Sequence, residues 1–135
     1  KASDEDLAPF QFARDAERAA RIAYGQQGKG MFVLTQGASE TVLFVGDTVL
    51  RSTPPSVVEV RDTVGAGDTF YAALLACLRR NGCCDLPTIQ DAATTIGETA
   101  LLQMLKYANA AAAINVSRSG CAPPTRAEIQ ALLDT

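Results

Sequence analysis

The apolar residues of this chain recur with two kinds of spacing. Longer stretches with helical spacing or continuous apolar character predict helices at 16–24, 70–78, 101–116 and 126–133. Shorter runs rich in β-branched residues predict strands at 31–35, 41–45, 48–51 and 57–60. Helices that alternate with short apolar strands predict the α/β class, with a sheet covered by helices.

Turn and capping residues mark the ends of several predicted elements. Gly46 and Asp47 separate two strand-like runs and predict a two-residue hairpin. Asp4 and Asp15 are each placed to cap a following helix, because an aspartate carboxylate can accept hydrogen bonds from the first free amides of a helix. The polar stretch 86–97 predicts a loop with some helix.

The composition excludes several kinds of protein. A chain of 135 residues is long enough for one domain with a buried core. The formal net charge is -3 and the basic residues do not cluster, which argues against a nucleic-acid interface and a basic membrane patch. Histidine is absent, which excludes Ser-His-Asp and Cys-His nucleophiles and His-containing metal clusters. Any catalysis must therefore use carboxylates, backbone dipoles, lysine, arginine or a bound metal ion.

The cysteines and the apolar runs predict a soluble, cytoplasmic protein. The four cysteines include no Cys-x-x-Cys pair, so they fit neither a zinc site nor a disulfide framework and are expected to be reduced thiols. No apolar stretch reaches the roughly 18 residues of a membrane span, and the first residues do not resemble a signal peptide. The first residue is not methionine, and we expect the chain to be a piece of a longer protein.

The segment most informative about chemistry is 62–69, Asp-Thr-Val-Gly-Ala-Gly-Asp-Thr, which lies between a strand-like run and an apolar helix. Gly65 and Gly67 allow a tight turn that brings backbone amides close to a ligand, and amides at a helix start suit phosphate oxygens. Asp68 would repel such a ligand unless its charge has a task, and accepting a proton from an attacking hydroxyl group is such a task. The alternative is that Asp68 only caps the helix that follows. Local spacing gives these two interpretations similar weight.

Comparison with known phosphate-binding motifs narrows the interpretation of this segment. It lacks the Gly-Lys-Ser/Thr ending of a Walker A motif, and Phe70 stands where a dinucleotide fingerprint has its third glycine. It closely resembles the C-terminal signature of the ribokinase/PfkB sugar-kinase family, Asp-Thr-x-Gly-Ala-Gly-Asp. The strand and glycine loop at 33–38 and the late helix and loop at 106–120 resemble the same family. Residues 1–7 are similar to the corresponding segment of its fructokinase-like members.

The resemblance implies roles for individual residues. Asp68 would accept the proton of the sugar hydroxyl, and the amides of Ala66, Gly67 and Asp68 would form an anion hole. The residues implied at the nucleotide are Thr35, Gly37, Ala38, Gly65, Gly67 and Asn109. Two of them have structural alternatives, since Gly37 could simply make a turn and Asn109 could satisfy buried backbone groups.

The resemblance also implies metal ions. Members of the family often bind K⁺ beside the anion hole, and the matching positions here are Asp62, Val64, Asn115, Arg118 and Gly120. The Mg²⁺-associated motif of the family, Asn-x-x-Glu, falls on residues 3–6, where Ser3 replaces Asn and Asp6 replaces Glu. The shorter carboxylate of Asp6 can still act on Mg²⁺ through water. An exposed capping cluster is the alternative for Asp4 and Glu5, and Asp62 could be a plain turn residue.

The resemblance covers nearly the whole chain, but only as the C-terminal half of a kinase. It implies that residues 1–135 form a single nucleotide-binding and catalytic portion of a ribokinase-like fold, with a helix-covered, mostly parallel sheet and a β-hairpin. The implied activity is transfer of the ATP γ-phosphoryl group to a sugar hydroxyl by a fructokinase-like enzyme, with ATP, Mg²⁺ and in some members K⁺ as cofactors. One alternative is a noncatalytic nucleotide-binding or scaffold protein on the kinase fold. Another is a kinase for a nucleoside or a sugar phosphate, with 2-keto-3-deoxygluconate among the candidate acceptors.

The expected partners follow from the same resemblance. They are a small-molecule sugar and ATP, with neither nucleic acid nor a membrane. The N-terminal half of the family supplies most sugar contacts and a lid, so we expect the 135-residue chain alone to be inactive. Apolar surface that this half would cover also predicts self-association, for example as a homodimer.

Overall fold

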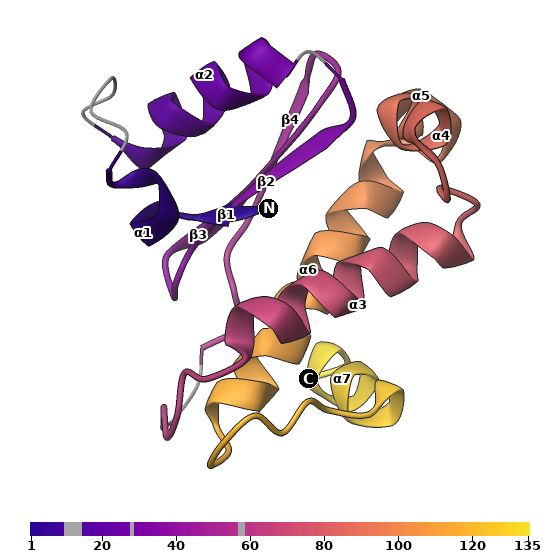
Figure 1. Cartoon of the computed structure of the whole chain (residues 1–135). Helices are drawn as coiled ribbons and strands as arrows, with labels where there is room; N and C mark the ends of the chain where they lie inside the picture. The colour runs from indigo at the N-terminus through magenta and orange to yellow at the C-terminus, as the bar shows by residue number, and fades with distance from the viewer. Residues whose placement is uncertain (10–14, 28, 57–58) are drawn as a thin grey trace.

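A computed structural model describes residues 1–9, 15–27, 29–56 and 59–135, and it has helices on both faces of a sheet (Figure 1). Within these residues the strands hydrogen bond in sequence order and are β1 (Ala2–Ser3), β2 (Met31–Gln36), β3 (Glu40–Val45) and β4 (Thr48–Ser52). The helices are α1 (Asp4–Leu7), α2 (Ala16–Gln27), α3 (Ala66–Arg80), α4 (Leu86–Gln90), α5 (Ala92–Thr95), α6 (Glu98–Val116) and α7 (Arg126–Leu133). The predicted α/β class is confirmed.

The sheet has both parallel and antiparallel pairings. β1 runs parallel to β2, with Ser3 opposite Thr35, whereas β2 with β3 and β3 with β4 are antiparallel. Gly46 and Asp47 join β3 to β4, which confirms the predicted hairpin. The part of the sheet within the described residues is therefore mixed, with one parallel and two antiparallel pairings.

The predicted strands agree closely with β2, β3 and β4, each of which is one residue longer than predicted. The fourth predicted strand, 57–60, is not present in its second half, because Glu59 and Val60 belong to no strand; Val57 and Val58 lie outside the described residues. The short strand β1 was not predicted. Two residues are too few to show a period, and β1 exists only through its pairing with β2.

Alternate side chains of β2 and β3 point into two apolar cores on opposite faces of the sheet. The core on the side of α1 and α2 contains Leu7, Ala19, Ala20, Leu34, Val42 and Phe44. The core on the side of α3 and α6 includes Val33, Leu43, Val45, Phe70, Leu74, Leu101 and Leu105. Figure 1 shows the two helix layers on either side of the strands. Burial on both faces explains why these strands are continuous apolar runs in the sequence.

The structure corrects two predicted helix starts and confirms one. Ser3, not Asp4, caps α1, because the Ser3 hydroxyl accepts from the Asp6 amide at 3.1 Å and the Asp6 carboxylate accepts from the Ser3 amide at 2.8 Å. The Asp15 carboxylate accepts from the Arg18 amide at 2.7 Å, which confirms the predicted cap of α2. The helix predicted from residue 70 begins at Ala66, and this shift places it in the site described below.

The other helices are close to their predictions. α7 has the predicted bounds, and α6 begins three residues earlier than the predicted residue 101. The stretch 86–97 contains α4 and α5. Both helices are too short to show a helical repeat of apolar residues in the sequence. Within the described part of the chain, no helix combines the length and the apolar character needed to cross a membrane.

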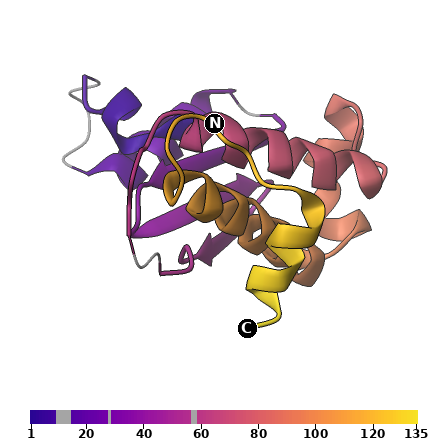
Figure 2. The same cartoon turned by 90° about the horizontal axis from the view of Figure 1, so that it is seen from below.

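α3 and α6 lie side by side and run in opposite directions, as Figures 1 and 2 show. The start of α3 therefore meets the end of α6. Backbone hydrogen bonds from the Arg61 and Asp62 amides to the Val116 carbonyl oxygen, at 2.8 and 3.2 Å, join the two ends. This junction contains most of the residues that the sequence selects for chemistry.

Candidate functional site

The first turn of α3 carries the carboxylate on which the sequence analysis depends. α3 begins at Ala66 after Gly65, whose φ of 76° lies in the left-handed region that glycine adopts without strain. Asp68 therefore lies inside the first turn, and its exposed carboxylate accepts no hydrogen bond from the described residues. The interpretation of Asp68 as only a helix cap is wrong, because the helix starts before it and Gly65 occupies the cap position.

The backbone amides of Gly67 and Asp68 have no hydrogen-bond acceptor within the described residues. The Ala66 amide donates to the Thr63 carbonyl oxygen at 3.2 Å, and the Thr69 amide donates to the Gly65 carbonyl oxygen at 2.8 Å. The amides of Gly67 and Asp68 make no comparable bond. Free amides at a helix start attract anions, because the aligned peptide dipoles leave a partial positive charge there. The turn therefore presents two donors next to an exposed carboxylate.

Asp62 holds the loop that leads into this turn. Its carboxylate accepts from the Val64 amide and from the Gly120 amide, each at 2.9 Å, and so joins the loop before α3 to the loop after α6. Hydrogen bonds from the Val64 amide first, and then from the Gly120 amide, hold the pKa of Asp62 below its ordinary value. The charged form of Asp62 is therefore part of the folded loop.

Asn115, near the end of α6, fixes the same loop from the interior. Its side chain is 0% exposed, and both of its polar atoms are bonded. Nδ2 donates to the Val64 carbonyl oxygen at 2.9 Å, and Oδ1 accepts from the Ala122 amide at 3.0 Å. A buried polar side chain is stable only when its hydrogen bonds are made, so Asn115 specifies how the two loops meet.

The loop after α6 is held from its other side by Arg118. The Arg118 guanidinium donates to the Ala122 carbonyl oxygen at 3.2 Å and forms an ion pair with Glu128 of α7. Its side chain is thus directed to α7 and not to the start of α3. This arrangement keeps the backbone of residues 118–122 close to Asp62 and Gly65.

Hydrogen bonds join all five positions predicted for K⁺, since the Arg118 amide also donates to the Asn115 carbonyl oxygen at 3.1 Å. Hydrogen bonds of 2.9 Å connect Asp62, Val64, Asn115 and Gly120, directly or through a neighbour. The oxygens involved are carboxylate and carbonyl oxygens, which keep further lone pairs and are the ligands that hard cations take. Within the described residues, no group of three acidic, cysteine or histidine side chains is arranged to hold a metal. The Asp62 carboxylate oxygens and the Val64 carbonyl oxygen are thus ligands of the kind that a hard cation takes.

Asp6 has the arrangement of a capping residue with one free oxygen. Its Oδ2 is occupied by the Ser3 amide, whereas Oδ1 makes no hydrogen bond with the described residues. The hydrogen bond from the Ser3 amide, and then that with the Ser3 side chain, lower the pKa of Asp6. Asp6 is thus a charged, exposed carboxylate that could act on Mg²⁺ through one oxygen and water.

Three of the six residues predicted at the nucleotide, Thr35, Gly37 and Ala38, lie at the end of β2 and in the turn between β2 and β3. Thr35 is half-buried opposite Ser3, and its hydroxyl donates to the Ala2 carbonyl oxygen at 3.5 Å. Gly37 has a φ of 55° and makes the turn, and Ala38 is exposed in it. Since β4 ends opposite Thr41, this turn lies at the end of the sheet from which the chain continues to α3.

Asn109 lies apart from this surface. It is 3% exposed, and it accepts from the Thr41 hydroxyl at 2.8 Å. Its Nδ2 donates to the Ser52 hydroxyl at 3.2 Å and to the Ser52 carbonyl oxygen at 3.4 Å. These contacts are those of the structural alternative, in which Asn109 satisfies buried polar groups and ties α6 to the sheet.

Two further residues contact the glycine turn and were not predicted from the sequence. A Cβ atom on Gly65 would lie 2.3 Å from the Cys121 Sγ, so the thiol packs directly against the turn. A Cβ atom on Gly67 would lie 3.0 Å from the Lys1 Nζ, so the lysine ammonium lies next to the free amides. Neither contact has a local sequence signal, because the partners are separated by more than fifty residues.

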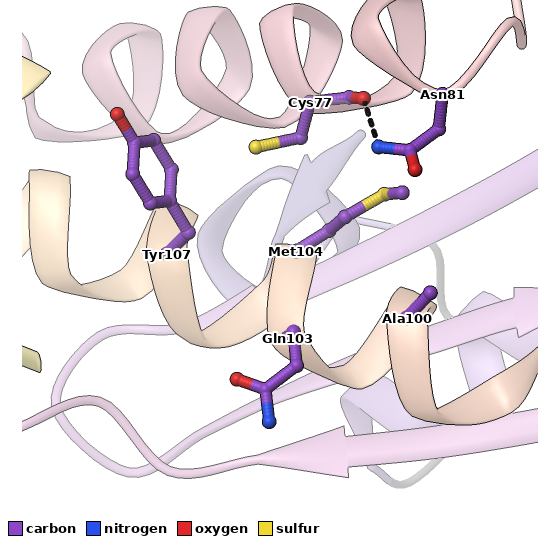
Figure 3. A pocket seen from close by; sticks show the side chains of 6 residues that line it. All are labelled: Cys77, Asn81, Ala100, Gln103, Met104 and Tyr107. Carbon is purple, nitrogen blue, oxygen red and sulfur yellow. Dashed lines mark hydrogen bonds between the residues drawn. The ribbon is translucent and has the colours of Figure 1, made fainter. Parts of the chain in front are cut away.

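Two cavities among the described residues lie away from this turn. A shallow cavity of about 360 Å³ lies between α3 and α6, and Figure 3 shows its lining residues, Cys77, Asn81, Ala100, Gln103, Met104 and Tyr107. A second cavity is lined by Asp15 and residues at the start of α2. The turn that carries Asp68 is instead an open surface in this chain.

Comparison with known proteins identifies the family of this chain. The profile of the pfkB family carbohydrate kinases matches residues 1–128. The bifunctional protein HldE of Azorhizobium caulinodans is 34% identical over 93% of this chain and 22% of its own length. The probable fructokinase-4 of Arabidopsis thaliana is 29% identical over 98% of this chain and 38% of its own length.

A solved structure shows the same fold. The aminoimidazole riboside kinase of Salmonella enterica, complexed with aminoimidazole riboside and an ATP analogue, has a TM-score of 0.77 and 26% identity over 98% of this chain. The chain covers 41% of that kinase, so it spans well under half the length of each of these three relatives. The expected ribokinase-like fold is confirmed. With its profile match over nearly all residues, the chain belongs to the pfkB family of carbohydrate kinases.

Proposed function

We propose that this chain is the C-terminal nucleotide-binding and catalytic portion of an ATP-dependent sugar kinase. The observation that supports this most directly is the first turn of α3. There the exposed carboxylate of Asp68 lies beside the unpartnered amides of Gly67 and Asp68. At one helix start, a carboxylate can accept the proton of a hydroxyl group, and neighbouring amides can donate hydrogen bonds to the phosphoryl group that this hydroxyl attacks.

In the proposed reaction Asp68 accepts the proton of the attacking sugar hydroxyl. The hydroxyl oxygen forms a bond to the γ-phosphorus while the bond from that phosphorus to the β,γ-bridging oxygen breaks, so that ADP leaves. The amides of Gly67 and Asp68 donate to the phosphoryl oxygens as negative charge spreads over them, and Ala66 borders them in the turn. Asp62 and Asn115 act indirectly, by fixing the loop from which these amides project.

The ions of the proposed site are Mg²⁺ and K⁺. Mg²⁺ bound to ATP would neutralise phosphate charge, and the free carboxylate oxygen of Asp6 is the group in this chain that could reach its water shell. K⁺ would be held by the carbonyl and carboxylate oxygens around Asp62 and Val64, with the loop at Gly120. We propose that K⁺ there keeps the loop in shape and does not touch the sugar.

The proposed acceptor is fructose or a similar sugar. Support comes from the probable fructokinase-4 of Arabidopsis thaliana, which the chain matches over 98% of its residues. The aminoimidazole riboside kinase, at 26% identity, keeps a nucleoside acceptor as the main alternative. Thr35, Gly37 and Ala38 are proposed to border the nucleotide, because they lie at the end of β2 and in the following turn, on the side of the sheet that leads to α3.

The chain by itself is proposed to bind ATP weakly and to transfer no phosphoryl group. It spans only 38% of the fructokinase relative, and the turn of Asp68 is open. Tyr71 and Leu75 follow on the outer face of α3 and are 45% and 44% exposed. Apolar side chains one helical turn apart suit cover by another part of the protein or by a second copy. A homodimer therefore remains part of the proposal.

The test measures ADP formation by the protein at its natural length, with Mg²⁺, ATP and a panel of sugars and nucleosides. We expect sugar-dependent ADP release that is highest with fructose. Release only with a nucleoside would keep the kinase and overturn the acceptor. ATP binding without ADP release for any acceptor would favour the noncatalytic nucleotide-binding protein. Sugar-dependent ADP release by the 135-residue chain alone would overturn its proposed inactivity.

A further inference from the structure

The lysine that precedes β1 is the basic side chain that contacts the start of α3. A Cβ atom on Gly67 would meet the Lys1 Nζ at 3.0 Å and its Cε at 3.9 Å. The ammonium group thus occupies the space that a side chain at Gly67 would take. Figures 1 and 2 both show the start of β1 near the first turn of α3.

The Lys1 ammonium forms no ion pair with the described residues. Its Nζ lies farther than 4.0 Å from every described carboxylate, and the ion pairs of the described chain use arginines. The charge of Lys1 makes a smaller contribution to the lowered pKa of Asp6, after the hydrogen bonds between the Asp6 carboxylate and Ser3. A lysine beside the positive end of a helix is unfavourable unless an anion lies between them. The same turn leaves the Gly67 and Asp68 amides unpartnered.

We infer that Lys1 binds the terminal phosphoryl oxygens of the nucleotide at the start of α3, together with the amides of Gly67 and Asp68. This inference rests on the proposed kinase function and adds a residue to it. A lysine ammonium is a compact charge with three donors, and it suits phosphate oxygens. It adds a full positive charge where two neutral amides provide partial charges only. Lys1 takes no part in the proton transfer, because the proton of the hydroxyl goes to Asp68.

The inference also explains the second glycine of the turn. Gly67 does not need its flexibility, since its φ is not positive. Its lack of a side chain leaves room for the lysine. Because the lysine end is flexible, alanine at this position should be accommodated by displacing the ammonium, with the fold kept and the phosphate site altered. Because Gly67 has a helical backbone in the first turn of α3, the Gly67→Ala variant should keep a stability close to that of the wild type.

The test compares Lys1→Gln and Lys1→Arg with Lys29→Gln, which removes an exposed lysine before β2. The measurements are kcat, KM for ATP, and the affinities for ATP and ADP by calorimetry, in the protein at its natural length. Lys1→Gln should weaken kcat/KM for ATP about 10- to 100-fold, as expected for a charged hydrogen bond to phosphate. ADP affinity should change much less, because ADP lacks the terminal phosphoryl group. Lys1→Arg should recover most of the loss, and Lys29→Gln should behave as the wild type.

A double-mutant cycle separates phosphate binding from a purely structural role. Gly67→Ala should lower activity in the wild-type background and have a smaller effect in Lys1→Gln, because the ammonium is already absent. Equal losses of ATP and ADP affinity in Lys1→Gln, or no loss of either, would overturn the inference while the kinase function stands. A wild-type protein without acceptor-dependent ADP release would overturn the proposed function, and this inference with it.

Discussion

The two long helices of this chain begin in the same way, yet only one of them begins at the candidate site. α3 follows Gly65 and α6 follows Gly97; both glycines have a positive φ, 76° and 83°, and neither helix has a side-chain cap. Each first turn also carries an acidic residue, Asp68 in α3 and Glu98 in α6. A glycine, a helix start and an acid are therefore not sufficient to make an anion site.

The difference lies in what surrounds each helix start. At α6 the Glu98 carboxylate accepts from the Thr48 hydroxyl at 3.2 Å, and a Cβ on Gly97 would meet nothing within 4 Å. At α3 the carboxylate is without a partner in the described residues, while the loop behind it is held by Asp62 and Asn115 and packed by Cys121. A preorganised site requires hydrogen-bond donors that are free to bind a ligand and a backbone that holds them in place. The start of α3 has both.

The largest expected effect comes from replacing the acid in the first turn of α3. Asp68→Asn should lower kcat about 10²- to 10⁴-fold, because the amide cannot accept the proton of the hydroxyl. ATP affinity should be kept or raised, because the substitution removes a negative charge beside the phosphate oxygens. Glu98→Gln is the matched control, since Glu98 also lies in the first turn of a glycine-started helix, and it should leave kcat unchanged. Comparable losses in both variants, measured by ADP release, would remove the distinction between the two helix starts.

The next effect concerns the buried support of α3. Asn115→Ala leaves the Val64 carbonyl oxygen and the Ala122 amide without their partner in the interior, which should lower the free energy of unfolding by about 1–3 kcal/mol for each group. ATP affinity should fall as well, because Val64 lies in the loop that places the free amides. Urea unfolding and calorimetry measure the two effects. A stability loss without any change in ATP affinity would separate the support from the site.

A smaller effect tests the packing of Cys121 against the glycine turn. Gly65→Ala adds a Cβ 2.3 Å from the Cys121 Sγ, and Cys121→Ala removes that sulfur. The two substitutions should therefore be coupled by about 0.5–3 kcal/mol in the free energy of unfolding. Gly97→Ala strains the backbone too but has no such neighbour, so it should add to Cys121→Ala within about 0.5 kcal/mol. Additive behaviour at Gly65 would contradict the contact.

The sequence predicts the local features of the α3 site better than its supports. Gly65, Gly67 and Asp68 stand in one short segment, so their spacing alone indicates a glycine turn with an acid. The start of α3 was placed too late, because glycines and an aspartate are typical of loops and only the packing of the following helix draws them into its first turn. The earlier start removes one of the two interpretations of Asp68, that of a helix cap.

The supports could not be predicted because they join distant parts of the chain. Asn115 and Val64 are 51 residues apart, and Asp62 and Gly120 are 58 residues apart. The resemblance brought Asp62 and Asn115 into the site as cation ligands, whereas the structure adds the hydrogen bonds of their side chains to backbone groups. A buried asparagine has no periodic signal, so its task is apparent only once the ends of α3 and α6 meet.

The smallest expected effect is the pH dependence of the Asp62 contact, which has no counterpart at the start of α6. The pKa of Asp62 is lowered in the folded chain by the Val64 and Gly120 amides, so its contribution to stability is complete above the unfolded value of about 4. That contribution should fall progressively as the pH drops through about 4 towards the lowered folded value. Asp62→Asn removes the titrating group. The difference in unfolding free energy between the wild type and this variant should therefore be constant near neutral pH and shrink below about pH 4. A difference that stays constant or grows in acid would mean that the Asp62 charge does not hold the two loops together.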